Sequence, residues 1–98
     1  MLLKTHSFEF GEFCLEGNEK ILLRQGKPVS LTPKALQLLS VLVENHGKIV
    51  EKEDLMRTVW ADSFVEESNL TFTISILRKT LNDGKTNRFI ETIPKRGY

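Results

Sequence analysis

Cysteine, long apolar runs and leader-like segments are scarce or missing in this sequence. Its single cysteine, Cys14, excludes an intramolecular disulfide framework and a multi-cysteine metal site. No apolar run approaches the ~18 residues of a membrane-spanning helix, and residues 1–10 lack the long apolar stretch of a signal peptide. We therefore expect a cytoplasmic location. The chain of 98 residues is long enough for one domain with one modest core.

Signatures of catalysis are missing as well. The sequence has no glycine-rich phosphate-binding loop, no HExxH zinc motif and no GxSxG nucleophile motif. The two histidines, His6 and His46, are isolated, and we interpret both as structural or solvated. We predict no enzymatic activity, no metal, no cofactor and no small-molecule substrate.

The charge of the chain is unevenly distributed. The formal net charge is only +1, but residues 1–77 carry eight Lys/Arg against eleven Asp/Glu, and residues 78–98 carry six against two. A basic end of this kind indicates a polyanion-binding surface. Charge alone leaves a solvated basic tail as the alternative.

The first third of the chain has the pattern of short strands. Apolar residues alternate with polar ones, and Gly-Glu, Gly-Asn and Gln-Gly pairs separate the runs with residues suited to tight hairpins. We predict an antiparallel meander of four strands, over 7–10, 13–16, 20–24 and 27–31.

The apolar period then becomes helical. Thr32 is suited to an N-cap, Pro33 to the first helical position and Gly47 to a C-terminal stop. Acidic residues at the start of the second helix complement the helix dipole. We predict helices over 33–45, 52–60 and 67–82.

The third helix has two contrasting faces. At about 100° per residue, one narrow apolar stripe must face the core. The opposite face combines short polar, apolar and basic side chains, which suit a major groove, where hydroxyl and amide groups meet base edges, apolar groups meet thymine methyls and cations meet phosphates. The stripe consists of Leu70, Ile74, Leu77 and Leu81; the outer face holds Ser68, Asn69, Phe72, Ser75, Ile76 and Lys79, flanked by Thr73 and Arg78.

Phe72 and Ile76 are the unusual members of this outer face. Two large apolar residues one turn apart are uncommon on a plainly solvated surface. A solvated amphipathic face, or packing against the N-terminal strands or a partner chain, remains the alternative to a DNA contact.

The C-terminal residues complete a winged helix-turn-helix, an α+β fold. Phe89–Ile93 is predicted as a strand, and Pro94 to Gly97 as a turn that leads into a return strand at Tyr98. We call residues 86–98 the wing; its cationic tip is suited to the minor groove or the phosphate backbone. The whole chain is then one domain, 1–98, with a sheet (7–31), a three-helix core (32–82) and the wing.

Three stretches resemble one family specifically. They are 29–39 (VSLTPKALQLL), 68–81 (SNLTFTISILRKTL) and 90–98 (IETIPKRGY). Together they resemble the DNA-binding C-terminal effector domain of OmpR/PhoB-type regulators, and most closely the ToxR/CadC-like variant. The resemblance covers essentially the whole chain, and it implies sequence-specific binding of double-stranded DNA in bacterial transcription regulation and signal transduction.

The resemblance also implies roles for individual residues. The helix around 67–82 is the expected recognition helix, with bases facing one group of side chains and phosphates another. Trp60 matches a backbone contact, although a core tryptophan without a DNA role is the alternative. The expected DNA-binding residues are Trp60, Ser68, Asn69, Phe72, Thr73, Ser75, Ile76, Arg78, Lys79, Thr92, Lys95 and Arg96, with Asn69, Phe72, Thr73 and Ile76 toward the bases.

The resemblance suggests partners too. Segment 61–67 matches a loop that some relatives use to contact RNA polymerase, and pairing of copies on tandem half-sites is expected. Ser75 and Ile76 replace arginines that are common in this helix, which weakens guanine reading. Because no receiver domain precedes the sheet after Met1, we expect the ToxR/CadC-like plan, with a sensor or inner-membrane segment elsewhere in a longer protein.

Two other functions stay open on the sequence. One is a winged helix used mainly for protein–protein interaction, with Phe72 and Ile76 as anchors. The other is binding of RNA or single strands through exposed aromatic residues on the sheet, but the alternating phenylalanines of the first strands are better explained by a core face.

Overall fold

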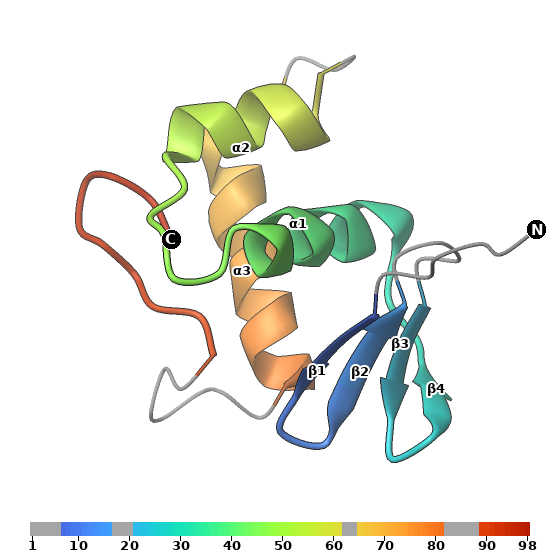
Figure 1. Ribbon diagram of the computed structural model, residues 1–98. Coiled ribbons are helices and arrows are strands. Elements are labelled where there is room, and N and C mark those ends of the chain that lie inside the picture. Colours follow the sequence, from blue (N-terminus) through green and yellow to red (C-terminus); the bar gives the residue numbers. More distant parts are fainter. Residues whose placement is uncertain (1–6, 17–20, 62–64, 82–88) are drawn as a thin grey trace, which may run out of the picture.

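The chain folds as a small sheet followed by three helices. A computed structural model describes residues 7–16, 21–61, 65–81 and 89–98. In Figure 1 the sheet lies below α1, and α3 crosses behind α1. The predicted α+β order is confirmed. The elements of the described residues are β1 (Ser7–Phe10), β2 (Phe13–Glu16), β3 (Ile21–Arg24), β4 (Lys27–Val29), α1 (Pro33–Glu44), α2 (Lys52–Val59) and α3 (Glu67–Thr80).

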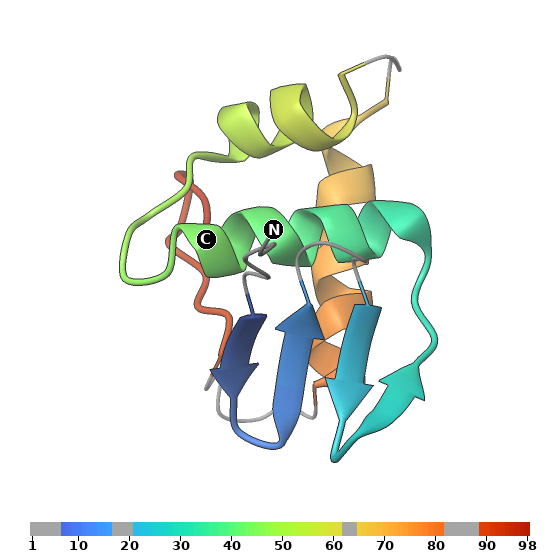
Figure 2. The ribbon, with the colours of Figure 1, turned by 45° about the vertical axis from the view of Figure 1, so that its right-hand side comes forward.

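The four strands form an antiparallel sheet in the order β1-β2-β3-β4, and Figure 2 shows them side by side. The register pairs Phe8 with Leu15, and Leu22 with both Leu15 and Val29. These apolar residues share the face that packs on the helices. Because side chains alternate along a strand, Cys14 lies on the other face and is only half-buried. Cys14 is therefore not a fully buried core residue.

The hairpin turns have the backbone that their sequences predict. Gly11, Gln25 and Gly26 all have positive φ, at 59°, 51° and 83°. The last strand is shorter than predicted, because β4 ends at Val29 and the chain then turns into α1. The predicted turn at 17–18 and the predicted strand start at residue 20 lie outside the described residues.

Helix α1 begins as the sequence predicts. The Ala35 amide donates to the Thr32 hydroxyl at 3.2 Å, so Thr32 is the N-cap. The helix ends at Glu44, one residue before the predicted end, and Gly47 follows with φ of 82°. Helix α2 also ends one residue early, and α3 ends at Thr80 with Leu81 as its C-cap, two residues before the predicted end.

The core lies where the sheet and all three helices meet. The predicted stripe of α3 is confirmed, because Leu70, Ile74, Leu77 and Leu81 are each at most 1% exposed. The sheet contributes Phe13, Leu15 and Leu22, and the other two helices contribute Ala35, Leu38, Leu39, Leu55 and Val59, with Trp60 beside them. In the part of the chain that is described, no helix has the length and apolar character needed to cross a membrane.

The wing differs from the predicted hairpin. Ile93 forms an isolated bridge to Gly97, and residues 89–92 are not part of a strand, so the predicted strand Phe89–Ile93 is wrong. The end of the wing instead pairs with the segment that precedes α2. The Val50 amide donates to the Tyr98 carbonyl at 2.7 Å, and the Tyr98 amide donates to the Val50 carbonyl at 3.0 Å. This partner is distant in sequence, and no local pattern indicates it.

Candidate nucleic-acid interface

The outer face of α3, which the sequence predicts as the DNA-binding surface, is mostly exposed. Ser68, Asn69, Phe72, Ser75 and Lys79 are all exposed, and Ile76 is half-buried. Phe72 is 65% exposed, the opposite of the buried stripe one half-turn away. The helix therefore presents short polar groups, an aromatic ring and a C-terminal cation together.

Thr73 does not belong to this face. It is 8% exposed, and its hydroxyl donates to the Asn69 carbonyl at 2.7 Å within α3. The expectation that Thr73 faces bases is therefore wrong in this structure. The wheel places Thr73 on a flank of α3, between the buried stripe and the exposed outer face.

Arg78 points from α3 into the wing. Its guanidinium donates to the Ile90 carbonyl at 2.9 and 3.3 Å and to the Thr92 hydroxyl at 2.6 Å. Its Cζ also lies 5.9 Å from the centre of the Tyr98 ring, within cation–π range. Arg78 is expected near phosphates and Thr92 as a DNA contact of the wing; in the structure the two side chains are hydrogen-bonded to each other.

The wing tip holds two cations in different situations. The Arg96 amide donates to the Ile93 carbonyl at 3.0 Å, and Lys95 has φ of 65°, so Pro94 and Lys95 occupy the centre of a turn with type II character. The Arg96 guanidinium donates to the Glu51 carboxylate at 2.7 and 3.2 Å. Lys95 makes no ion pair with any residue in the described ranges. The tip therefore offers one unpaired cation and one that is engaged.

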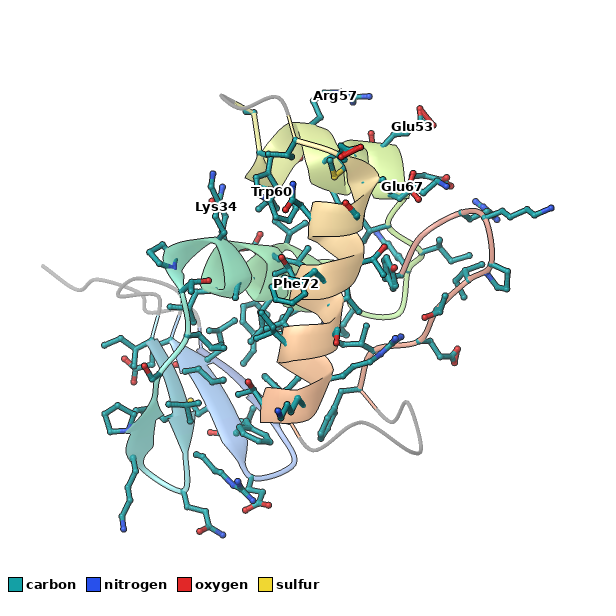
Figure 3. All side chains as sticks on the ribbon, turned by 180° about the vertical axis from the view of Figure 1, so that it is seen from behind. Lys34, Glu53, Arg57, Trp60, Glu67 and Phe72 are labelled. Atoms are coloured by element: carbon teal, nitrogen blue, oxygen red, sulfur yellow. The ribbon has the colours of Figure 1, made fainter. Side chains whose placement is uncertain are left out.

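Trp60 is the C-cap of α2 and is 8% exposed. Trp60 is therefore a core residue, the alternative that the sequence left open. Lys34, from the first turn of α1, donates to the Val59 carbonyl at 2.6 Å beside it, and Figure 3 shows Lys34 and Trp60 next to each other. A cation at a helix C-terminus is favourable for the helix dipole.

Two residues that position this surface were missed by the sequence reasoning, Lys34 and Glu51. Lys34 lies within the 29–39 stretch, but its partner is 25 positions away in sequence. Glu51 was interpreted only as helix-start chemistry, whereas its carboxylate also anchors the wing. The sequence shows a lysine at the start of one helix and an acidic residue before α2, but it does not indicate which residue either side chain contacts.

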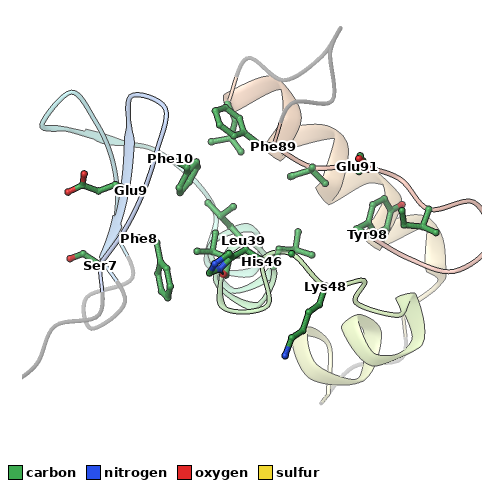
Figure 4. Close-up of a pocket in the computed structure, with 16 residues that line it drawn as sticks. Ser7, Phe8, Glu9, Phe10, Leu39, His46, Lys48, Phe89, Glu91 and Tyr98 are labelled. Atoms are coloured by element: carbon green, nitrogen blue, oxygen red, sulfur yellow. The ribbon is translucent and has the colours of Figure 1, made fainter.

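A cleft of about 640 Å³ lies elsewhere on the molecule. It opens between β1, the C-terminal part of α1 and the wing, and Figure 4 shows Phe8, Phe10 and Phe89 along it. None of the expected DNA-binding residues lines this cleft. Among the described residues there is also no cluster of three or more His, Cys, Asp or Glu that could hold a metal ion.

Similarity to known proteins points in one direction. Residues 26–98 match the family described as "Transcriptional regulatory protein, C terminal". The chain is 42% identical over 96 residues to the transcriptional regulator HilA of Salmonella typhi, covering 98% of this chain but 17% of HilA. It thus spans about a sixth of that relative.

Solved structures agree with the sequence match. The response regulator DrrB of Thermotoga maritima, an OmpR/PhoB homologue, is 30% identical with a TM-score of 0.85, covering 94% of this chain and 42% of DrrB. The DNA-binding domain of Escherichia coli CadC is 31% identical with a TM-score of 0.75, covering 90% of this chain and 84% of that domain.

Proposed function

The chain belongs to the family of C-terminal domains of transcriptional regulatory proteins, with the winged-helix fold of OmpR/PhoB-type regulators, and we propose that it binds double-stranded DNA with α3 in the major groove. The observation that carries the proposal is the outer face of α3. One side of this helix is fully buried, and the other holds exposed hydroxyl, amide, aromatic and ammonium groups. That set matches the chemistry of base edges and phosphates.

The wing supports the proposal by its position beside α3. Arg78 ties the C-terminal half of α3 to the wing at Ile90 and Thr92, so both elements are held in one arrangement. Lys95, at the tip, projects from a backbone conformation that is unfavourable for a non-glycine residue. Lys95 also makes no ion pair with the described residues, which supports a role toward the phosphate backbone or the minor groove.

The expected residues divide by their placement. We propose that Asn69, Phe72 and Ile76 face bases. Two serine hydroxyls, and two lysines that form no ion pair with the described residues, face phosphates. Arg78, Arg96 and Trp60 act mainly by positioning, since each is engaged or buried within the fold. The proposed phosphate group is Ser68, Ser75, Lys79 and Lys95.

Duplex binding is tested by fluorescence anisotropy at about 50 and 200 mM salt. The probes are the promoter of the gene that encodes this chain and a scrambled duplex of the same composition. A fall in affinity of about tenfold between these two salt concentrations, with a higher affinity for the promoter at both, supports the proposal. Lys79→Ala should reduce the salt slope by about one unit, because one phosphate contact is lost. Lys27→Ala removes an exposed cation from β4 and should leave the slope unchanged. No salt-sensitive binding at any ionic strength contradicts the proposal.

The proposal includes two protein partners, a second copy of the domain and RNA polymerase. We propose that copies of the domain pair on tandem half-sites, and that the loop around 61–67 contacts RNA polymerase; of this loop, residues 62–64 lie outside the described residues. Half-site pairing predicts that a duplex with two correctly spaced sites binds two copies more tightly than two separate sites. Equal affinity for both designs contradicts pairing.

A further inference from the structure

Phe72 is an exposed aromatic ring that the fold itself does not use. It is 65% exposed, and the other large apolar side chain that is exposed in the described residues is Ile49, at 43%. Ile76, one turn further along α3, is half-buried beside it. Figure 3 shows Phe72 on α3. Exposed apolar side chains that lie next to each other often mark an interaction site. On the proposed DNA-binding face, we expect them to contact an apolar group in the groove.

The polar residues around Phe72 narrow the choice of partner. Ser68, Asn69 and Ser75 are short and uncharged. Arg78, the arginine of α3, directs its guanidinium to the wing rather than to the outer face. Guanine reading by arginine or lysine is the commonest specific contact in the major groove, and on the outer face of α3 the cation is Lys79, which we assign to a phosphate.

From this arrangement we infer that Phe72 is a specificity-determining residue that packs against the 5-methyl group of thymine, with Ile76 extending the same apolar contact. The thymine methyl is the one apolar feature that a base pair presents in the major groove. The half-site is then read at thymines, and at adenines by the Asn69 amide, rather than at guanines. This inference rests on the proposed function, because it assumes that α3 lies in the groove.

The test uses the 98-residue chain and DNA that differs by one methyl group. A preferred duplex is first selected from a pool with a randomised 20-base-pair centre. Each thymine of that duplex is then replaced in turn by deoxyuridine, which removes the methyl and keeps all base-pair hydrogen bonds. At a contacted thymine we expect the affinity to fall about fourfold, the equivalent of one buried methylene.

Phe72→Ala assigns the contact to this residue. The variant should bind the thymine duplex more weakly and show no difference between thymine and deoxyuridine at the same position. Ile49→Ala removes the other exposed apolar side chain, outside α3, and should keep the fourfold difference. Circular dichroism checks that the variants fold, which is expected for exposed positions.

The outcomes separate this inference from the proposed function. If no duplex is enriched at any salt concentration, DNA binding itself is refuted. If a duplex is enriched but every deoxyuridine substitution is neutral, DNA binding stands and thymine reading is refuted. If Phe72→Ala weakens thymine and deoxyuridine duplexes equally, the ring contacts something other than the methyl, such as a sugar or a protein partner, and the inference is again overturned.

Discussion

Gly97 joins the wing to the start of α2, and its replacement by alanine tests that junction. A Cβ at this position would lie 1.9 Å from the Val50 carbonyl oxygen and 3.0 Å from the Glu51 Cα. These are backbone atoms, so the two segments must separate to admit the methyl group. Separation breaks the two Val50–Tyr98 hydrogen bonds and the bond from the Lys52 amide to the Arg96 carbonyl.

The cost follows from those three bonds. At roughly 1 kcal/mol each, Gly97→Ala should lower the free energy of unfolding by about 3 kcal/mol. For a domain of this size the melting temperature should fall by about 10–20 °C. Thermal unfolding followed by circular dichroism measures the change. Because the tip is displaced as well, duplex affinity should also fall at a temperature where the variant is folded.

Gly26→Ala is the matched control for this variant. Gly26 has φ of 83° with nothing within 4 Å of its added Cβ, so only backbone strain opposes the change. The expected loss is about 1 kcal/mol. A melting temperature for Gly97→Ala that equals the wild-type value, or that falls no further than that of Gly26→Ala, would refute the packing of the wing against the segment before α2.

Four further substitutions test single contacts. Lys95→Ala should flatten the salt slope of duplex binding by about one unit, and Arg96→Ala should flatten it by less, because Arg96 is already paired with Glu51; equal effects on the slope would contradict this. Glu51→Gln should steepen the same slope by releasing Arg96, and an unchanged slope would show that the ion pair does not limit it. Thr32→Ala removes the hydroxyl that caps α1 at Ala35 and should cost about 1 kcal/mol in chemical denaturation, whereas a neutral result would dismiss the cap.

The elements of the fold could be predicted because their signals are local. Period-two alternation and hairpin residues predicted the strands. The helical period of α3 predicted each of the four residues of its buried stripe. Thr32 was recognisable as an N-cap because its partner is three residues away. Each of these predictions needed only neighbours in sequence.

The partners of the charged residues could not be predicted in the same way. A wheel shows which face Arg78 occupies, but not that its long side chain reaches the Ile90 carbonyl twelve positions later. Arg96 and Glu51 are 45 positions apart, and nothing in either local pattern connects them. Thr73 was misplaced for a related reason, since a flank of a helix is buried or exposed according to what packs beside it. Hence the residue types on the proposed DNA-binding face could be predicted, but which of these side chains are already engaged within the fold could not.

That availability sets the strength expected of the proposed interface. The described parts of α3 and the wing contain four cations, Arg78, Lys79, Lys95 and Arg96, of which two are engaged within the fold. Two phosphate contacts correspond to a salt slope near −2, so these cations make affinity fall only about tenfold between 50 and 200 mM salt, far less than for a protein with six to ten contacts. These two contacts alone therefore supply little electrostatic affinity, and the base contact proposed for Phe72 adds to them. The proposed pairing of copies on neighbouring half-sites is consistent with this estimate, because a second domain adds its own contacts to the same DNA.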